Sequence, residues 1–279
     1  MPRVTSLYRG RVLPLALRLR TGAGWLGRGL VDLVYPPVCV LCNAALPPER
    51  LSRLLCEPCC RRLAPEEWSG CRRCGAIQPD GLDRPETCPT CRKHPRHFDA
   101  AFPLGAYEGE LREVVLRTKR LAHESLTKAL GRLLADRRGV ELAQFRPDLI
   151  VPIPMHWWRR LWRGVNNTEI LAEELGRRLE KPVMGRLLVR RRPTRPQKDL
   201  LLPERLANLR NAFRLRRSHP QAGARQAGAR QAGAPARWQD SHILLVDDIL
   251  TTGATSSEAA RVFKQAGAGA VAVAVLARA

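Results

Sequence analysis

Hydrophobic positions in the last forty residues follow two different spacings. Residues 243–246 form a continuous leucine and β-branched run, which is typical of a parallel strand covered on both faces, and the run at 270–277 predicts a final strand that closes the sheet. Between the two runs, apolar residues at helical spacing over 256–266 predict an amphipathic helix that stops at Gly267. The pattern therefore predicts a strand, a loop, a helix and a second strand.

The same alternation of strands and helices recurs upstream. Residues 148–152 form a short apolar run, and residues 166–180 carry apolar positions at helical spacing. The pattern also predicts a strand pair around residues 102–107, helices from about residue 111 and over 125–135, a strand at 187–189, a short helix at 203–209 and a strand at 212–215. We therefore expect an α/β domain over residues 98–279, with a parallel sheet flanked by helices.

Two segments depart from this alternation. Residues 1–38 comprise an arginine-rich leader and a short amphipathic helix at about 25–34, which we expect to pack on the module that follows. Residues 221–235 repeat QAGAR, QAGAR and QAGAP with almost no large apolar side chain, so they cannot bury enough surface to become ordered. We interpret residues 218–238 as a disordered insertion between two strands.

All nine cysteines lie within residues 39–91, and eight of them form four CxxC pairs at a repeated interval. Two such pairs can close a tetrahedral four-thiolate zinc site, so sequential pairing predicts two structural zinc ribbons in a module over residues 39–97. The predicted ligands are Cys39, Cys42, Cys56, Cys59, Cys71, Cys74, Cys88 and Cys91. Cys60 is left over as a bystander. Disulfides are the disfavoured alternative, and whether one or both ribbons bind zinc stays open.

The chain is strongly basic, with 48 Lys+Arg, 26 Asp+Glu and a formal net charge of +22. Residues 146–217 hold 18 basic and 7 acidic residues, so this part alone contributes an excess of 11. That concentration favours polyanionic ligands. No apolar run is long enough to span a membrane, and the arginines around the apolar patch at 12–19 make it a poor signal peptide, so we expect a cytoplasmic protein.

Residues with chemical potential follow the run at 243–246. Asp247 and Asp248 stand where that strand is expected to end, and Thr251, Thr252, Gly253, Ala254 and Thr255 lead into the next helix. The backbone N–H groups of such a loop and the helix macrodipole favour a phosphate. Paired carboxylates suit neighbouring hydroxyls or a hydrated Mg²⁺ instead. A ribose 5-phosphate would suit both features, because its phosphate could bind the loop and its hydroxyl groups could bind the carboxylates.

Two basic loops are expected at the same edge, because ligands of open α/β sheets bind at the carboxyl ends of the strands. In the loop at 154–164, Arg159, Arg160 and Arg163 are candidates to bind a pyrophosphate, and the loop at 190–198 adds further basic residues. Trp157, Trp158 and Trp162 alternate with those arginines, an arrangement that can stack on single-stranded DNA. The favoured alternative is that the indole rings cover the sheet edge or pack on the zinc module.

Residues 247–255 resemble the phosphoribosyl pyrophosphate (PRPP) signature of type I phosphoribosyltransferases. Over nearly all of residues 30–279 the chain resembles the ComF family, the competence protein F-like phosphoribosyltransferases with an N-terminal cysteine-rich module. Besides the cysteines and the PRPP signature, the matching positions are Lys119, Val151, Pro152, Pro154, His156, Arg159, Arg163, Gly164, Asn166, Thr194, Gln197, Leu200, Arg205, Asn208, Ala212 and Phe213. Val165 and Asn167 stand where the family has Phe and Gln.

The resemblance implies a type I phosphoribosyltransferase fold that binds Mg-PRPP through Asp247, Asp248 and the loop at 251–255. It implies transfer of the phosphoribosyl group to an unidentified acceptor, with no catalytic side chain singled out. The implied pyrophosphate or flexible-loop residues are Lys119, Pro154, His156, Arg159, Arg163, Asn166, Gln197, Lys198 and Arg205. It also implies uptake of single-stranded DNA in natural transformation, beside a helicase-like partner.

A different class of function remains open beside the enzyme. The fold could serve as a non-catalytic single-stranded DNA-binding component, with Trp157, Trp158, Arg160 and Trp162 as the DNA candidates. A glutamine-dependent amidotransferase is not expected, because no cysteine nucleophile stands near Met1 and Pro2.

Overall fold

A four-stranded parallel sheet forms the centre of the protein. The computed structural model describes residues 36–77, 88–119, 123–154, 166–191, 208–216 and 238–279. The strands β1 (Ala100–Ala106), β2 (Leu149–Pro152), β5 (His242–Leu250) and β6 (Ala270–Arg278) lie in the order β1-β6-β5-β2. All three pairings are parallel, which confirms the predicted α/β architecture.

Three details of the predicted strands are wrong. Residues 102–107 contain one strand rather than a pair, and β1 tolerates Pro103 because an edge strand can lose a ladder hydrogen bond. The final strand β6 lies inside the sheet and does not close it. β5 continues through Asp247 and Asp248 to Leu250, because its register with β6 persists to the pair of Leu250 and Arg278.

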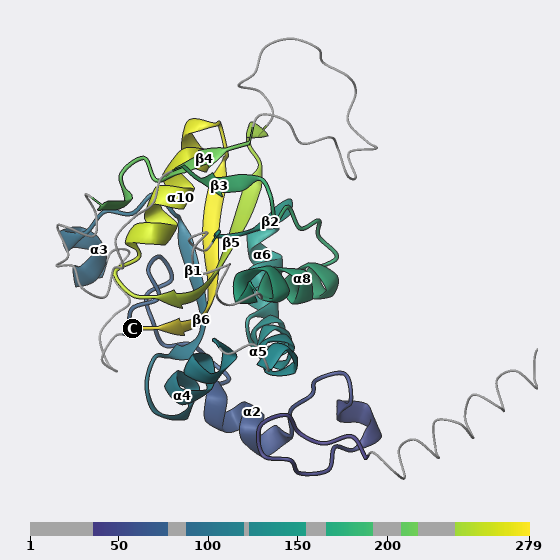
Figure 1. Ribbon diagram of the computed structural model, residues 1–279. Coiled ribbons are helices and arrows are strands. Elements are labelled where there is room, and N and C mark those ends of the chain that lie inside the picture. Colours follow the sequence, from purple (N-terminus) through teal and green to yellow (C-terminus); the bar gives the residue numbers. More distant parts are fainter. Residues whose placement is uncertain (1–35, 78–87, 120–122, 155–165, 192–207, 217–237) are drawn as a thin grey trace, which may run out of the picture.

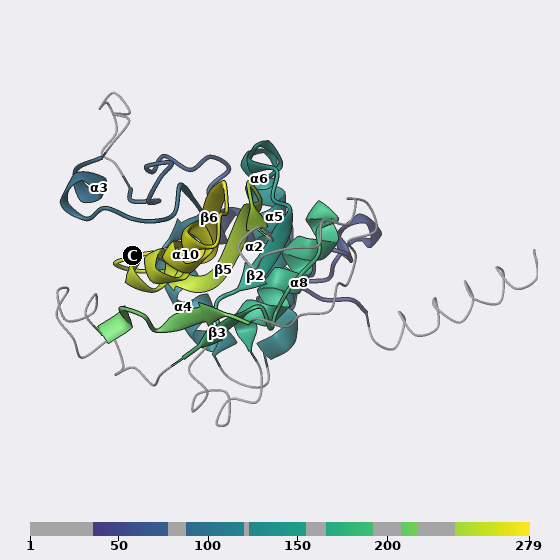
Figure 2. The ribbon, with the colours of Figure 1, turned by 90° about the horizontal axis from the view of Figure 1, so that it is seen from above.

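Both faces of the sheet are buried, which explains the continuous apolar runs. Leu244 and Val246 of β5 belong to one hydrophobic cluster, whereas Ile243 and Leu245 belong to another on the opposite face. The first face is covered by α4 (Gly109–Thr118), α5 (Glu124–Arg137), α6 (Gly139–Phe145) and α8 (Asn167–Leu179). The second is covered by α10 (Ala254–Gln265) and by the antiparallel pair β3 (Leu188–Arg190) and β4 (Phe213–Leu215). Figures 1 and 2 show these layers.

In its described residues, the cysteine-rich module contains three short helices, η1 (Pro48–Arg50), α2 (Glu57–Leu63) and α3 (Pro89–Lys93). Its first half packs on the helical face, where Leu55 and Leu63 join the cluster that contains residues of α4 and α5. Its second half runs beside the edge strand, since the Ala101 N–H of β1 donates to the Arg72 carbonyl at 3.0 Å. The hydrophobic core therefore extends across the predicted boundary between residues 97 and 98.

A buried arginine joins the first half of the module to the sheet. Arg138, which is 1% exposed, donates from Nε to the Pro103 carbonyl of β1 at 2.9 Å. It also donates from Nη1 to the Glu66 carbonyl at 3.2 Å and from Nη2 to the Pro65 carbonyl at 3.4 Å. One side chain thus satisfies carbonyl groups of both parts of the chain.

Other predictions fall outside the described residues. They include the helix at 25–34, the repeat at 221–235 and most of the helix at 203–209. Among the helices that the structure does describe, none has the length and apolar character needed to cross a membrane.

Candidate functional site

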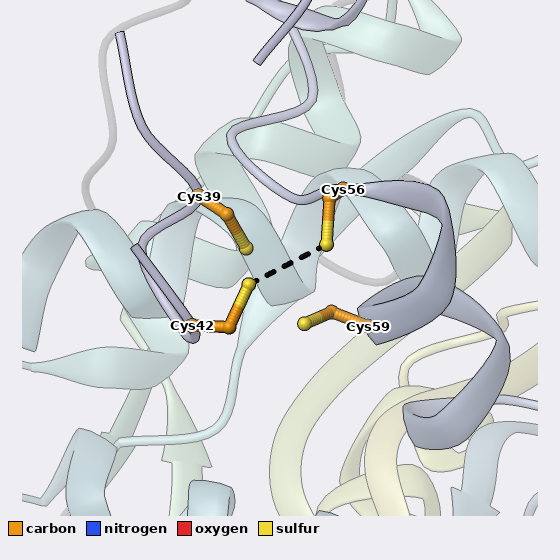
Figure 3. A group of neighbouring side chains, drawn as sticks. All are labelled: Cys39, Cys42, Cys56 and Cys59. Carbon is orange, nitrogen blue, oxygen red and sulfur yellow. Dashed lines mark hydrogen bonds between the residues drawn. The ribbon is translucent and has the colours of Figure 1, made fainter. Parts of the chain in front are cut away.

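The eight CxxC cysteines gather in two groups of four, with the sulfur atoms of each group within 4.8 Å of one another. The first group is Cys39, Cys42, Cys56 and Cys59, whose side chains converge on one point (Figure 3). The second is Cys71, Cys74, Cys88 and Cys91. The predicted sequential pairing is therefore confirmed. Cys60 belongs to neither group; it is 2% exposed and packs in the core.

The distances between sulfur atoms fit a four-thiolate zinc site. Neighbouring sulfur atoms lie 3.6 Å apart between Cys42 and Cys56, and 3.5 Å apart between Cys74 and Cys88. Zinc–sulfur bonds of about 2.3 Å in a tetrahedron place the sulfur atoms roughly 3.8 Å apart, whereas a disulfide needs about 2.05 Å. All nine cysteines are free thiols. Both groups thus have the donor set of a structural zinc ribbon.

The backbone around the cysteines supports thiolates at two positions. Burial alone would raise the pKa of Cys39 and Cys88, but hydrogen bonds outweigh it and lower the pKa of Cys39 to about 6 and of Cys88 to about 7. In the second group the Cys91 N–H donates to the Cys88 sulfur at 3.4 Å. Burial and the neighbouring thiols raise the pKa of Cys59 and Cys91. Four thiolates so close together need a bound cation to compensate their charge.

The two aspartates lie at the carboxyl edge of the sheet. The pairing of β2 with β5 ends at Pro152 and Val246, and β5 continues beyond it with Asp247 and Asp248. The Asp248 N–H donates to the Asp247 carboxylate at 2.9 Å, and the Ile249 N–H donates to the Asp248 carboxylate at 2.8 Å. Both side chains remain partly exposed. They are therefore fixed by the backbone at the edge where ligands of parallel sheets bind.

Lys119 is brought to this pair from far along the chain. It caps the C-terminus of α4, and its Nζ lies 3.7 Å from a carboxylate oxygen of Asp248. The position is held by Asn167, whose Nδ2 donates to the Thr118 carbonyl at 2.7 Å. Asn167 stands where the ComF pattern has Gln, and here it positions the end of α4. Lys119 thus lies beside the aspartate pair.

The threonine-glycine loop connects β5 to α10. Gly253 is the N-cap of α10 with φ 75°, a left-handed conformation that favours glycine, and the Ala254 N–H lies 3.3 Å from the Thr252 hydroxyl oxygen. The helix begins at Ala254, two residues earlier than predicted, and contains 12 residues. Its N-terminus and the loop follow the aspartates directly. The two acids, the loop and the helix N-terminus therefore follow one another at one strand end, in the predicted order.

The electrostatic environment of Asp247 is unfavourable to its charge. Asp247 keeps some exposed surface, but the protein packed around its carboxylate removes much of the water. This desolvation, followed by the negative charge of Asp248, raises the pKa of Asp247 well above its ordinary value, against smaller opposing effects of the Asp248 N–H and of Arg190. Arg190 ends β3, and its guanidinium lies 5.2 Å from the ring centre of Phe213. A cation or a set of hydroxyl donors at this site would relieve the repulsion between the two carboxylates.

The remaining predicted residues divide into two sets. Pro154 follows β2 and is partly exposed, and Asn166 is buried at the start of α8, where its carboxamide oxygen accepts from the Thr168 hydroxyl at 2.7 Å. Outside the described residues lie His156, Trp157, Trp158, Arg159, Arg160, Trp162, Arg163, Gln197, Lys198 and Arg205. Their predicted contacts stay predictions.

Two buried arginines beside the loop had not been predicted. Arg278 donates from Nη1 to the carbonyl oxygens of Leu250 at 3.0 Å and Thr251 at 2.8 Å, and Arg96 donates from Nη2 to that of Thr252 at 3.0 Å. Both side chains are 7% exposed. The one signal in the sequence is that Arg278 follows directly on the apolar run of the last strand.

The fold and the two cysteine groups define a double zinc-ribbon protein joined to a parallel α/β domain. The family model of the double zinc ribbon domain matches residues 30–92. The chain is 30% identical over 254 residues to the DNA utilization protein YhgH of Escherichia coli strain K12, covering 88% of this chain and 99% of that protein. It is 28% identical over 228 residues to competence protein F of Haemophilus influenzae, covering 81% of this chain and 90% of that protein.

A YhgH protein of Salmonella typhimurium matches at the same 30% identity over 254 residues. The chain therefore belongs to the ComF family, the family of competence protein F and DNA utilization protein YhgH.

Proposed function

We propose that the protein binds Mg-PRPP at the carboxyl edge of the sheet and transfers its phosphoribosyl group to an acceptor. The observation that carries the proposal is the sequence of groups along one strand end. Asp247 and Asp248 are followed at once by the loop at 251–255 and the N-terminus of α10, and Lys119 approaches the acids from the side.

Each group suits one part of PRPP. The loop N–H groups and the α10 dipole would bind the 5-phosphate, and the two carboxylates would accept hydrogen bonds from the ribose 2′ and 3′ hydroxyls. Hard carboxylate oxygens also suit Mg²⁺, which would neutralise part of the pyrophosphate charge when bound. Lys119 is 25% exposed at its side chain and close enough to the acids to supply a positive charge beside the pyrophosphate.

In the proposed reaction the bond between ribose C1 and the pyrophosphate oxygen breaks, and a bond from C1 to the acceptor forms. Pyrophosphate leaves with the electron pair, and the acceptor loses a proton. Catalysis of this kind depends on orienting the ribose and stabilising charge in an oxocarbenium-like state, so no nucleophilic side chain is required. The loops at 152–163 and 190–198 are the proposed contacts of the departing pyrophosphate.

Calorimetric titration with PRPP and Mg²⁺ tests the assignment. Joint substitution of Asp247→Asn and Asp248→Asn is expected to abolish measurable binding. A matched control is the pair Asp99→Asn and Asp148→Asn, because these aspartates accept backbone N–H groups at the amino ends of β6 and β5, both at 2.8 Å. The control removes the same charge from the opposite edge and should leave binding intact. Unchanged affinity in the first pair would refute the site.

Pyrophosphate release against a panel of bases, amines and single-stranded DNA would then identify the acceptor. Release that requires PRPP, Mg²⁺ and one member of the panel supports transfer. Binding of PRPP with no release in any combination would leave a PRPP-binding protein without this enzymatic activity.

A second candidate is binding of single-stranded DNA. It is supported by the names of the relatives, which refer to competence and to DNA utilization, and by the net charge of +22. It predicts an affinity for single-stranded DNA that falls steeply with salt and is reduced by Trp157→Ala with Trp158→Ala. Both functions can reside in one protein, because PRPP and a DNA strand are phosphate polyanions. Absent or salt-insensitive binding would exclude the second.

A further inference from the structure

Two buried arginines connect the second cysteine group and the chain after α3 to the threonine-glycine loop. Arg278 is the bridge: it donates from Nε to the Cys74 carbonyl at 3.0 Å and from Nη1 to the carbonyls of Leu250 and Thr251 at 3.0 Å and 2.8 Å. Cys74 is itself a member of the second group. One guanidinium therefore connects the backbone of a metal-site residue to the start of the loop.

Arg96 makes a second connection between the module and the loop, at Thr252. Its Nη2 donates to the Thr252 carbonyl at 3.0 Å, and its Nη1 donates to the His94 carbonyl at 2.9 Å, just after α3. The Arg96 carbonyl in turn accepts from Nη2 of Arg73 at 3.1 Å, and Arg73 lies between two cysteines of the group. Arg96 is close to the loop, because a Cβ on Gly253 would lie 2.9 Å from its Nε.

These contacts fix which way the loop peptides face. The carbonyl oxygens of three consecutive residues, Leu250, Thr251 and Thr252, are all held by the two arginines. In a planar trans peptide the C=O of one residue and the N–H of the next point in opposite directions. The N–H groups of Thr251, Thr252 and Gly253 must therefore point away from the arginines. Successive N–H groups facing one way form the concave nest that binds anions.

We infer that the second zinc ribbon is a brace for the phosphate-binding loop, with Arg96 and Arg278 as its positioning residues. Neither arginine is expected to touch the ligand; each holds carbonyl groups so that the opposite N–H groups are preorganised. The four cysteines fit a structural metal, and a rigid ribbon gives the guanidinium groups fixed anchors at Cys74 and His94. The consequence for phosphate binding rests on the proposed function, whereas the bracing of the loop does not.

The experiment is hydrogen–deuterium exchange on the full-length, zinc-loaded protein, followed in peptides that cover residues 250–258. Arg278→Lys keeps the charge but replaces the forked guanidinium with a single ammonium group. That group cannot bond the carbonyls of Cys74, Leu250 and Thr251 at once. Exchange in these peptides should become about tenfold faster, the factor expected for losing roughly one hydrogen bond to a charged donor. Arg96→Lys should also make exchange in these peptides faster. If Arg278→Lys does not fold, the result for Arg96→Lys alone tests the inference.

Arg138→Lys is the matched control. Arg138 is equally a buried arginine that joins the module to β1 through carbonyl groups, but the carbonyl groups that it bonds belong to residues 65, 66, 103, 104 and 137 and not to the loop. It should leave exchange at 250–258 unchanged, and zinc content by elemental mass spectrometry should be equal in all variants. Exchange that is unaltered in Arg278→Lys and Arg96→Lys overturns the inference. Exchange that rises equally in all three variants also overturns it, since the effect is then general destabilisation.

Titration of the same proteins with PRPP separates this inference from the proposed function. If the wild type binds PRPP, the two loop variants should bind at least tenfold more weakly while the control does not. If the wild type does not bind PRPP, the proposed function fails, and the exchange measurement still decides whether the ribbon braces the loop. Faster exchange with unchanged PRPP affinity would refute the proposed link to phosphate binding.

Discussion

Replacement of Asp247 by asparagine should stabilise the protein and weaken its binding of PRPP. The Asp248 N–H donates to the Asp247 carboxylate at 2.9 Å, and the carboxamide oxygen of asparagine can accept the same bond. The substitution therefore removes a charge and little else. Burial and the charge of Asp248 disfavour that charge and raise the pKa of Asp247, while Arg190 compensates only in part. Removal of such a destabilised functional group typically adds about 0.5–2 kcal/mol to the free energy of unfolding.

The gain in stability should depend on pH in a defined direction. Because the pKa of Asp247 is raised in the folded protein, the folded state holds this proton more tightly than the unfolded chain. The resulting stability is fully present below about pH 3.9, the ordinary pKa of an unfolded aspartate, and is lost as the pH rises through the folded-state value. The asparagine variant lacks this loss. Its advantage over the wild type should grow from acid pH towards neutrality and then become constant.

Thermal unfolding between pH 4 and pH 8 measures this difference. A gain of about 0.5–2 kcal/mol corresponds to roughly 1–8 °C in the melting temperature of a domain of this size. Asp148→Asn is the control, because Asp148 also accepts a backbone N–H beside β5, from His242 at 2.8 Å, but its side chain is exposed. A lower melting temperature for Asp247→Asn at neutral pH, or a gain that does not change with pH, would refute this account of the site.

Three further predictions concern other parts of the molecule. Asn167→Ala should lower the free energy of unfolding by about 1–3 kcal/mol, because the Thr118 carbonyl loses its 2.7 Å partner, and calorimetry should show weaker PRPP binding; Asn167→Gln should retain more of both. Elemental mass spectrometry should find two zinc ions per chain, and Cys42→Ala or Cys74→Ala should each remove one; a count of one in the wild type contradicts this. Arg138→Ala should destabilise the protein by about 3–5 kcal/mol or prevent folding, as measured by urea unfolding, because it removes the donor of two buried hydrogen bonds, to Pro103 and Leu104, and of two partly buried ones, to Pro65 and Glu66.

Features that depend on short stretches of sequence were predictable. The two four-cysteine groups follow from the CxxC spacing, since each pair is a local turn and the pairs close in sequence order. The strand at 243–246, the loop after it and the helix beyond are likewise consecutive, so the apolar run and the glycine were sufficient to place them. The end of β5 was misplaced because aspartate is rare in strands, whereas pairing with β6 carries the strand through both acids.

Contacts between distant parts of the chain were not predictable in the same way. Arg278 and Cys74 are separated by 204 positions, and no periodicity in either segment indicates that the last strand will lie beside the module. The same holds for Lys119 and Asp248, which meet only because α4 ends at the carboxyl edge of the sheet. A buried arginine in an apolar strand is the general clue to such contacts, because a charge is rarely buried without partners.

The two halves of the cysteine-rich module are joined to different sides of the proposed site. The first half reaches α4 through Arg62, whose Nε lies 2.8 Å from the carboxylate of Glu110, and α4 ends at Lys119. The second half reaches the loop through Arg278 and Arg96. Zinc bound at the two cysteine groups would make each segment a fixed support, which a module of this size without metal would not be. This arrangement gives a physical reason why a zinc-ribbon module and the proposed sheet-edge ligand site occur in one chain: the first half of the module shares a hydrophobic cluster with α4, and the second half is hydrogen-bonded to the loop.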